Sequence, residues 1–431
     1  MSASDGPMQR AVLPTRAADP LSGSATARKV VARLPSFESL LGATAPPAPG
    51  APPQQTATLD DAADEFLRRA GTAPAPVLPE GVAGLRALSR LRSWDAIVSR
   101  TAGPATDAAA CALWRAVALH HLRRPSDDIL KGQLKALAPA LDYTKTPPNA
   151  VTVSLRIAAA HFAADADARL ALLQQLLKDV GSGPLARWVR LALADEHCAS
   201  GRWRLAVADL SAARLAVVRD AVKPHLRGTA NHGHGCASAG HLDSMLGRIF
   251  SQVSMLAEAR DSFKRSELWL RVAVSDFDAC DDRSEAAEHA RAKAMALPHM
   301  HAALVAFARD DYANAALGFK AAALHEESFF DAPGGGDDLA GLFRAPSAAT
   351  NGAAICALYV CDLESAISLL EALVRRNAAL HLTDIVAFNI CTLYDLASSN
   401  SCAARRKRVL QHVAARSGLG DVDAASFRIA A

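Results

Sequence analysis

Pairs of small residues twelve positions apart recur along the chain, and this recurrence constrains the fold more than any other feature. In most copies a large apolar residue follows the second small residue by four positions. The copies are Ala194, Ala206 and Leu210; Gly247, Phe250, Ala259 and Phe263; Ala303, Ala315 and Phe319; Ala354, Ala366 and Leu370; and, more weakly, Cys391, Tyr394 and Ala403. Small side chains let two helix backbones approach closely where they cross, so the pattern predicts a series of helical hairpins.

The spacing between the copies is longer than in the standard tetratricopeptide repeat. Successive second alanines lie 53, 56 and 51 residues apart, whereas the standard repeat has about 34 residues. Turn segments also recur between the paired helices, at residues 201–203, 310–312 and 361–363. We therefore expect an α-solenoid of irregular tetratricopeptide-like hairpins, interrupted by longer helices or by loops. The glycine-bearing segments 228–240 and 331–347 are the expected loops.

The composition agrees with an all-α fold and excludes several classes of protein. Hydrophobic residues make up 51% of the chain but aromatic residues only 5%, which favours helices packed through small side chains over a β-sandwich. Alternation with a period of two residues is lacking, which argues against an α/β enzyme fold. A net charge of +3 with no concentrated basic face predicts no nucleic-acid partner.

The first 77 residues differ from the rest of the chain. Twelve of the 22 prolines lie within the first 79 residues, and proline lacks the amide hydrogen that helices and sheets need. We predict a disordered, Pro/Ala-rich arm over residues 1–77 and the helical solenoid over residues 78–431. Within the arm, residues 34–41 and 60–69 could become helical on a partner, or could show only passing helicity.

Eight cysteines are spread singly without a CxxC pair, which predicts reduced, buried thiols in a cytoplasmic protein. The N-terminus lacks a secretory hydrophobic region, and the sequence has no run of 18 apolar residues that would span a membrane.

One group of residues has spacing reminiscent of a metal site. His225, His232, His234 and Cys236 lie close together, but a fourth ligand with zinc-finger spacing is missing and glycines fill the gaps. A solvated loop is the simpler interpretation, and we predict neither a metal nor another cofactor. The GxSxG, HExxH and GxxxxGK[ST] motifs are all missing, so the sequence predicts no enzyme.

The basic run at residues 405–408 could meet an acidic partner or an anionic membrane surface. A solvated helical face is the simpler interpretation of this run.

Several helical segments resemble subunit 12 of the transport protein particle (TRAPP) vesicle-tethering complex. The resemblance runs in order through residues 80–431 and is densest between residues 240 and 400. Its matching segments are residues 246–252, with the family's Gly-Arg-Ile-Phe; residues 351–359 and 370–374; and residues 388–399, with Phe-Asn-Ile-Cys-Thr-Leu-Tyr. The expected loops and the acidic run at residues 276–288 depart from the family pattern.

The resemblance implies a non-enzymatic scaffold subunit acting in traffic from the endoplasmic reticulum to the Golgi. Its partners would be other subunits of the complex, and it would meet a Rab GTPase only indirectly. It would be cytoplasmic and peripherally associated with ER–Golgi intermediate or Golgi membranes.

Two alternatives remain open from the sequence. A tetratricopeptide adaptor of another system, such as a chaperone adaptor, would need lysines beside Asn351 and Asn389, and these are missing. A metal-dependent enzyme would use the cluster at residues 225–236.

Overall fold

The chain is described here from a computed structural model. The described residues are 59–67, 81–90, 92–103, 107–124, 127–143, 145–163, 165–331 and 348–429. Over these residues the chain is all-α, with 19 α-helices, two short 3-10 helices and no strand. Most of the expected arm, including residues 34–41, and residues 332–347 of the second expected loop lie outside the described residues.

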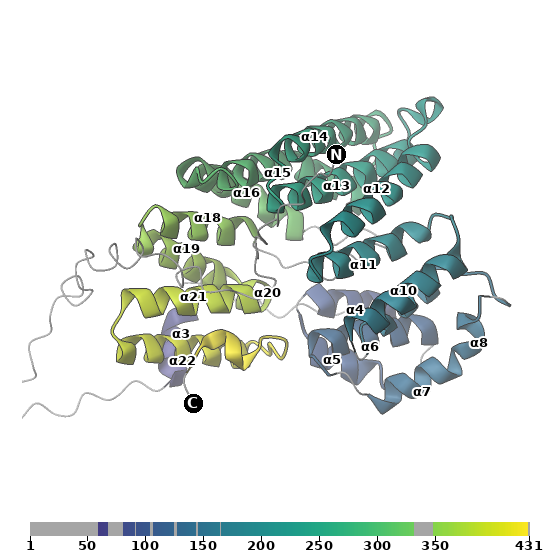
Figure 1. Cartoon of the computed structure of the whole chain (residues 1–431). Coiled ribbons are helices and arrows are strands. Elements are labelled where there is room, and N and C mark those ends of the chain that lie inside the picture. The colour runs from purple at the N-terminus through teal and green to yellow at the C-terminus, as the bar shows by residue number, and fades with distance from the viewer. Residues whose placement is uncertain are drawn as a thin grey trace, which may run out of the picture.

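The helices follow one another as a curved stack (Figure 1). In chain order they are α3 (Leu59–Leu67), α4 (Gly81–Arg90), α5 (Trp94–Arg100), α6 (Ala108–His121), α7 (Asp128–Ala136), α8 (Ala138–Leu141), α9 (Ala150–Ala160), α10 (Ala166–Val180), α11 (Ala186–Ala199), α12 (Trp203–Asp220), η1 (Pro224–Leu226), α13 (Ala230–Gln252), α14 (Leu256–Ala279), α15 (Glu285–Phe307), α16 (Tyr312–Asp331), α18 (Ala348–Tyr359), α19 (Leu363–Arg376), α20 (Ala378–His381), α21 (Asp384–Ala397), α22 (Asn400–Arg416) and η2 (Ala424–Phe427).

The apolar core is divided among clusters that follow the order of the chain. One joins α11, α12 and α13, and another joins α14, α15, α16 and α18. Such a series of local cores is typical of a solenoid, in which each hairpin buries its apolar face against its neighbours. The expected all-α, solenoid-like fold is confirmed. Among the described residues, no helix is both long and apolar enough to cross a membrane.

Four hairpin turns share one backbone conformation. Gly201, Ser254, Asp310 and Cys361 have positive φ angles of 69°, 62°, 61° and 66°. Each lies five residues before the second alanine of its hairpin. In each turn the next residue donates its amide to the carbonyl oxygen five positions earlier, at 2.7–3.0 Å. This Schellman arrangement satisfies carbonyl groups at the end of the first helix and directs the chain into the second.

The prediction of a loop at residues 228–240 is wrong, because most of this segment forms the start of α13. Its glycines lie where helices approach closely. A Cβ atom at Gly233 would lie 2.7 Å from the ring of Phe277, and one at Gly235 would lie 2.8 Å from the Cβ of Ala221. The glycines therefore serve packing, although in the sequence they suggest a break in the helix.

Helix α3 packs against the last hairpins of the chain, far from its neighbours in sequence (Figure 1). Ala63 is fully buried in the apolar cluster that α18, α19, α21 and α22 form. The segment 60–69, for which helix formation on a partner or only passing helicity were the alternatives, is helical through Leu67 and packs on this chain itself. The boundary between arm and solenoid at residues 77 and 78 stays a prediction.

Candidate functional site

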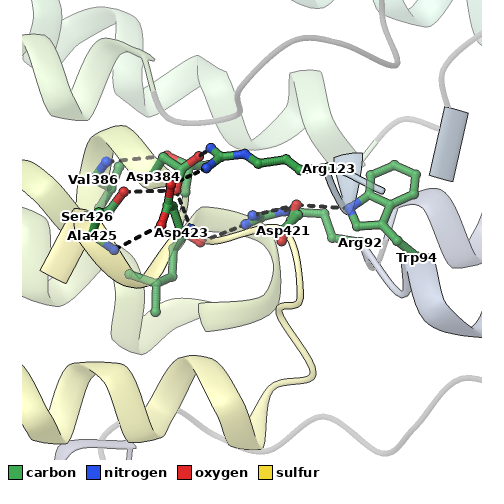
Figure 2. A network of polar contacts seen from close by, with 11 residues as sticks. Arg92, Trp94, Arg123, Asp384, Val386, Asp421, Asp423, Ala425 and Ser426 are labelled. Atoms are coloured by element: carbon green, nitrogen blue, oxygen red, sulfur yellow. Dashed lines mark hydrogen bonds and ion pairs between the residues drawn. The ribbon is translucent and has the colours of Figure 1, made fainter. Parts of the chain in front are cut away.

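The two ends of the helical stack meet in a polar contact (Figure 2), which we call the closing contact. Arg92, between α4 and α5, donates Nε and Nη2 to Oδ2 of Asp421 at 2.9 and 2.8 Å. Trp94 donates its indole Nε1 to the same oxygen at 2.9 Å. The side chains of Arg92 and Asp421 are only 10% and 7% exposed. The pair therefore interacts away from solvent, where removal of one partner is costly.

The remaining donors of Arg92 reach the end of helix α20. Its Nη1 donates to the carbonyl oxygens of Leu382 and Ala379 at 2.8 and 3.3 Å. Carbonyl groups at the end of a helix lack partners within the helix, and a cation there also complements the helix dipole. One guanidinium group thus joins the first helices of the stack to two segments of the last hairpins.

A second arginine forms the exposed part of the closing contact. Arg123, after α6, makes ion pairs with Asp384 and Asp423. Asp384 also accepts hydrogen bonds from the amide of Asp423 at 2.7 Å and from Oγ of Ser426 at 3.0 Å. Because these groups are partly exposed, water and salt weaken the contribution of Arg123 relative to that of Arg92.

Close packing accompanies the charges at the closing contact. The rings of Trp94 and His121 stack with their centroids 4.0 Å apart. A Cβ atom at Gly420 would lie 2.9 Å from Cδ2 of Leu122 and 3.0 Å from Oδ2 of Asp95. The last segment of the chain therefore approaches the first hairpins closely at position 420, where the side chains of Leu122 and Asp95 would have to shift to admit a Cβ atom.

Of the four residues with spacing reminiscent of a metal site, only His232 and Cys236 lie together in the structure, and Asp276 joins them. His232 and Cys236 lie one turn apart on α13 and are buried together with Asp276 of α14. His234 points elsewhere and lies 3.9 Å from Asp282, and His225 is exposed in η1. The interpretation of this segment as a solvated loop is therefore wrong from residue 230 onward, since α13 begins there. The spacing of four residues between His232 and Cys236 can be read from the sequence, but nothing in the sequence indicates that Asp276 joins them.

Hydrogen bonds already engage the polar atoms of this buried cluster. Oδ2 of Asp276 lies 2.6 Å from Nδ1 of His232, and Oδ1 accepts the amide of Gly228 at 2.8 Å. Sγ of Cys236 lies 3.6 Å from Nδ1 of His232. Burial, followed by the charge of Asp276, raises the pKa of Cys236 to about 12. The thiol is therefore protonated at neutral pH and is a poor nucleophile.

The three side chains of the buried cluster are of types that bind zinc. In the structure, the distance of 2.6 Å between Nδ1 and Oδ2 is that of a hydrogen bond. Two ligands of a tetrahedral zinc ion lie about 3.3 Å apart, so the side chains would have to separate to hold an ion. As arranged, the cluster links the start of α13 to the end of α14. The expectation that the chain holds no metal stays a prediction.

The residues expected to pack the repeats lie inside the stack. All are buried except Phe250, which is half-buried. A Cβ atom at Gly247 would lie 2.4 Å from ring atoms of Phe263, whose ring also stacks on His301 of the next hairpin at 4.1 Å. Phe319 similarly contacts the helix that carries Gly352. Whether these residues determine the stability of the array is a proposal, which a variant of Gly247 tests below.

The basic run at residues 405–408 divides between the interior and the surface. Lys407 is buried and donates Nζ to Asp395 at 2.7 Å and to the carbonyl oxygen of Arg428 at 3.0 Å. Arg406 lies over the ring of Tyr394, at 4.3 Å from its centroid. Arg405 and Arg408 are exposed. Two of the four cations therefore hold the last hairpin together.

Comparison with known proteins gives a similarity to a limited part of the chain. Over 70 residues the chain is 37% identical to mouse and to human "Trafficking protein particle complex subunit 12". The aligned region is 16% of this chain and 9% of each relative. No family model matches the chain. Part of the chain is thus distantly similar to a TRAPP subunit, and the resemblance along the remaining helices rests on the motifs alone.

Proposed function

We propose that this chain is a non-enzymatic scaffold subunit of a TRAPP-type vesicle-tethering complex. The supporting observation is the similarity over 70 residues to a trafficking protein particle subunit. The all-α stack is compatible with this role, because curved helical arrays offer long surfaces to other proteins. Its partners would be other subunits of the complex, with a Rab GTPase engaged only through them. The chain would act in the cytoplasm, on the surface of ER–Golgi intermediate or Golgi membranes.

Neither alternative function gains support from the described residues. Nδ2 of Asn389 donates to Oδ1 of Asn351 at 2.8 Å, so these two asparagines bind each other across α18 and α21. In a chaperone adaptor they would be directed at a peptide carboxylate. A hydrolase built on the buried cluster would need an accessible metal-bound water, whereas His232, Cys236 and Asp276 are all buried.

Affinity purification from the native cell under gentle lysis tests the proposal. A tagged chain is expected to co-isolate other TRAPP subunits, identified by mass spectrometry. Recovery of a clean monomer would count against the proposal.

A surface variant would locate the contact. Leu317 and Leu324 are 66% and 80% exposed, and they lie two turns apart on α16. We expect Leu317→Glu/Leu324→Glu to reduce the recovery of the other subunits without lowering the melting temperature. Leu172→Glu, a half-exposed leucine on α10, is the matched control.

A further inference from the structure

Helix α3 occupies a defined face of the last hairpins, which we call the terminal face. This face consists of Arg375 of α19, His412 and Arg416 of α22, and the apolar side chains around Ala63. Ala63 is fully buried there, and Phe66 and Leu67 pack against the same apolar cluster. The face is therefore an apolar surface bordered by two arginines and a histidine.

Two acids of α3 match two basic side chains of the terminal face in spacing. Oδ1 of Asp60 lies 2.6 Å from Nε2 of His412, and Oδ1 of Asp64 accepts Nη1 of Arg416 at 2.7 Å. The two acids are one helical turn apart on α3, and the two bases are one turn apart on α22. The hydrogen bond between Asp60 and His412 and the ion pair between Asp64 and Arg416 thus fix the position of α3 along α22.

Arg375 recognises the other end of α3. Its guanidinium lies over the ring of Phe66, 4.7 Å from the centroid, and its Nε donates to the carbonyl oxygen of Phe66 at 3.2 Å. A carbonyl in the last turn of a helix has no partner within that helix, so this bond caps α3. Arg375 is itself held by Glu371, which accepts Nη2 at 2.6 Å. The terminal face therefore recognises a helix end together with an aromatic side chain.

Helix α3 is held on the terminal face weakly enough for another helix to displace it. The helix has nine residues, which is too short to be stable by itself in water. Thirteen residues of sequence separate it from α4. The side chains of Asp60 and Asp64 are 72% and 54% exposed, and exposed ion pairs contribute little. The chain thus supplies its own short helix to a face that any helix with the same pattern would fit.

We propose that the terminal face binds an acidic amphipathic helix of a partner protein, and that α3 is an internal competitor for this face. The partner helix would carry two acids one turn apart, a small residue beside the second acid, and an aromatic residue two positions after that acid. The covalent link presents α3 at an effective concentration on the order of millimolar, so only a tighter or locally concentrated partner displaces it. This inference rests on the proposed scaffold function, for which it names one docking surface.

Binding of a peptide to the purified full chain tests the proposal. The probe is a fluorescent peptide with the sequence of residues 57–69, and its anisotropy reports binding. Asp64→Arg/Phe66→Ala in the chain is expected to displace α3 and to open the terminal face. We expect the opened chain to bind the peptide about tenfold or more tightly than the wild-type chain, in which α3 competes. Glu65→Lys changes a charge on the same helix that makes no ion pair among the described residues, and this variant should behave as wild type.

A charge exchange distinguishes recognition from damage to the fold. A Phe66→Ala/Arg416→Asp chain keeps Asp64, which the new carboxylate repels, so α3 should again leave the face. This chain should not bind the wild-type peptide, whereas a peptide carrying Asp64→Arg should bind it. An opened chain with a native circular dichroism spectrum that does not bind the peptide would overturn the proposal. A wild-type dimer that Asp64→Arg converts to monomer would assign the face to a second copy and would also overturn it. Because only the purified chain is used, these results are independent of whether TRAPP subunits co-purify.

Discussion

The turns at the start of the stack and those in its middle use one backbone conformation for different purposes. Arg92 and Arg123 follow α4 and α6 with positive φ angles of 52° and 54°, close to the 61° of Asp310 and the 66° of Cys361. The side chains of the middle turns are short, whereas the two arginines reach the last hairpins of the chain. A left-handed residue other than glycine costs about 1–2 kcal/mol. At the first turns this cost is offset by a contact that closes the stack.

This chain joins the two ends of its helical stack without changing the backbone conformation of the hairpin turns. In a solenoid each hairpin normally contacts only its neighbours, so the end hairpins need a cover. In the middle turns the left-handed residue has a short side chain. In the first turns the same position is occupied by an arginine, Arg92 or Arg123. Closure therefore depends on two side chains that project from turns with the same backbone conformation as those in the middle.

Replacement of Arg92 by glycine should produce the largest effect. Glycine relieves the positive φ angle but leaves the buried carboxylate of Asp421 without its cation, so we expect a loss of about 3–5 kcal/mol in the free energy of unfolding. Urea denaturation measures this loss, and small-angle X-ray scattering should show a larger radius of gyration. The double variant Arg92→Met/Asp421→Asn removes both charges and should recover part of the stability. A fully stable Arg92→Gly chain of unchanged size would contradict closure by this pair.

Gly247→Trp should be the next most damaging change, and it acts in the middle of the stack. Ring atoms of Phe263 would lie 2.4 Å from a Cβ atom at this position, so the indole has no room and we expect a loss of up to about 3 kcal/mol. Thermal denaturation followed by circular dichroism measures it. In contrast to Arg92→Gly, the polar closing contact should remain. An unchanged melting temperature would refute the assignment of Gly247 to repeat packing.

Acidification should weaken the closing contact by a smaller amount. Burial, with added repulsion from Arg376 and Arg92, lowers the pKa of His381 to about 4 from its ordinary value of 6.5. Between these values the unfolded chain binds a proton at His381 that the folded chain does not, so stability falls as the pH falls. Between pH 7 and pH 5 this residue should account for a loss of about 2 kcal/mol.

Denaturation of wild type and His381→Gln at both pH values isolates this contribution. The variant should lose less stability on acidification. Some dependence should remain because burial also lowers the pKa of His120 to about 4. Equal losses in the two chains would show that His381 is not responsible.

Glycine at a middle turn should have the smallest effect and the opposite sign. Cys361 is exposed and left-handed, so Cys361→Gly should raise the free energy of unfolding by about 0.5–1 kcal/mol. Arg123→Gly relieves the same strain but loses exposed ion pairs, so its net effect should be close to zero. Denaturant titration of the two variants side by side gives the comparison. If Cys361→Gly destabilised the chain as much as Arg92→Gly, the proposal that the first and middle turns have different roles would be wrong.

Three of the middle turns can be predicted from the sequence, whereas the closing contact cannot. The turn segments 201–203, 310–312 and 361–363 were recognisable because hairpin turns are local and recur. The turn at Ser254 was not recognised, and the glycines near residue 235 suggested a loop because close helix packing cannot be distinguished from chain breaking in one sequence. The pairing of Arg92 with Asp421 had no sequence signal, since arginine and aspartate are also common at exposed turns.

The recurring small residues are enough to predict that this protein is a series of helical hairpins. Helix formation and hairpin packing act between residues near one another in the chain, and small residues at fixed spacing report that packing directly. Three features become visible only in the folded chain: the two ends meet, Asp276 joins His232 and Cys236, and α3 covers the last hairpins. Arg92 and Asp421 are 329 residues apart. Their approach depends on the summed curvature of every hairpin between them, which no local pattern in the sequence encodes.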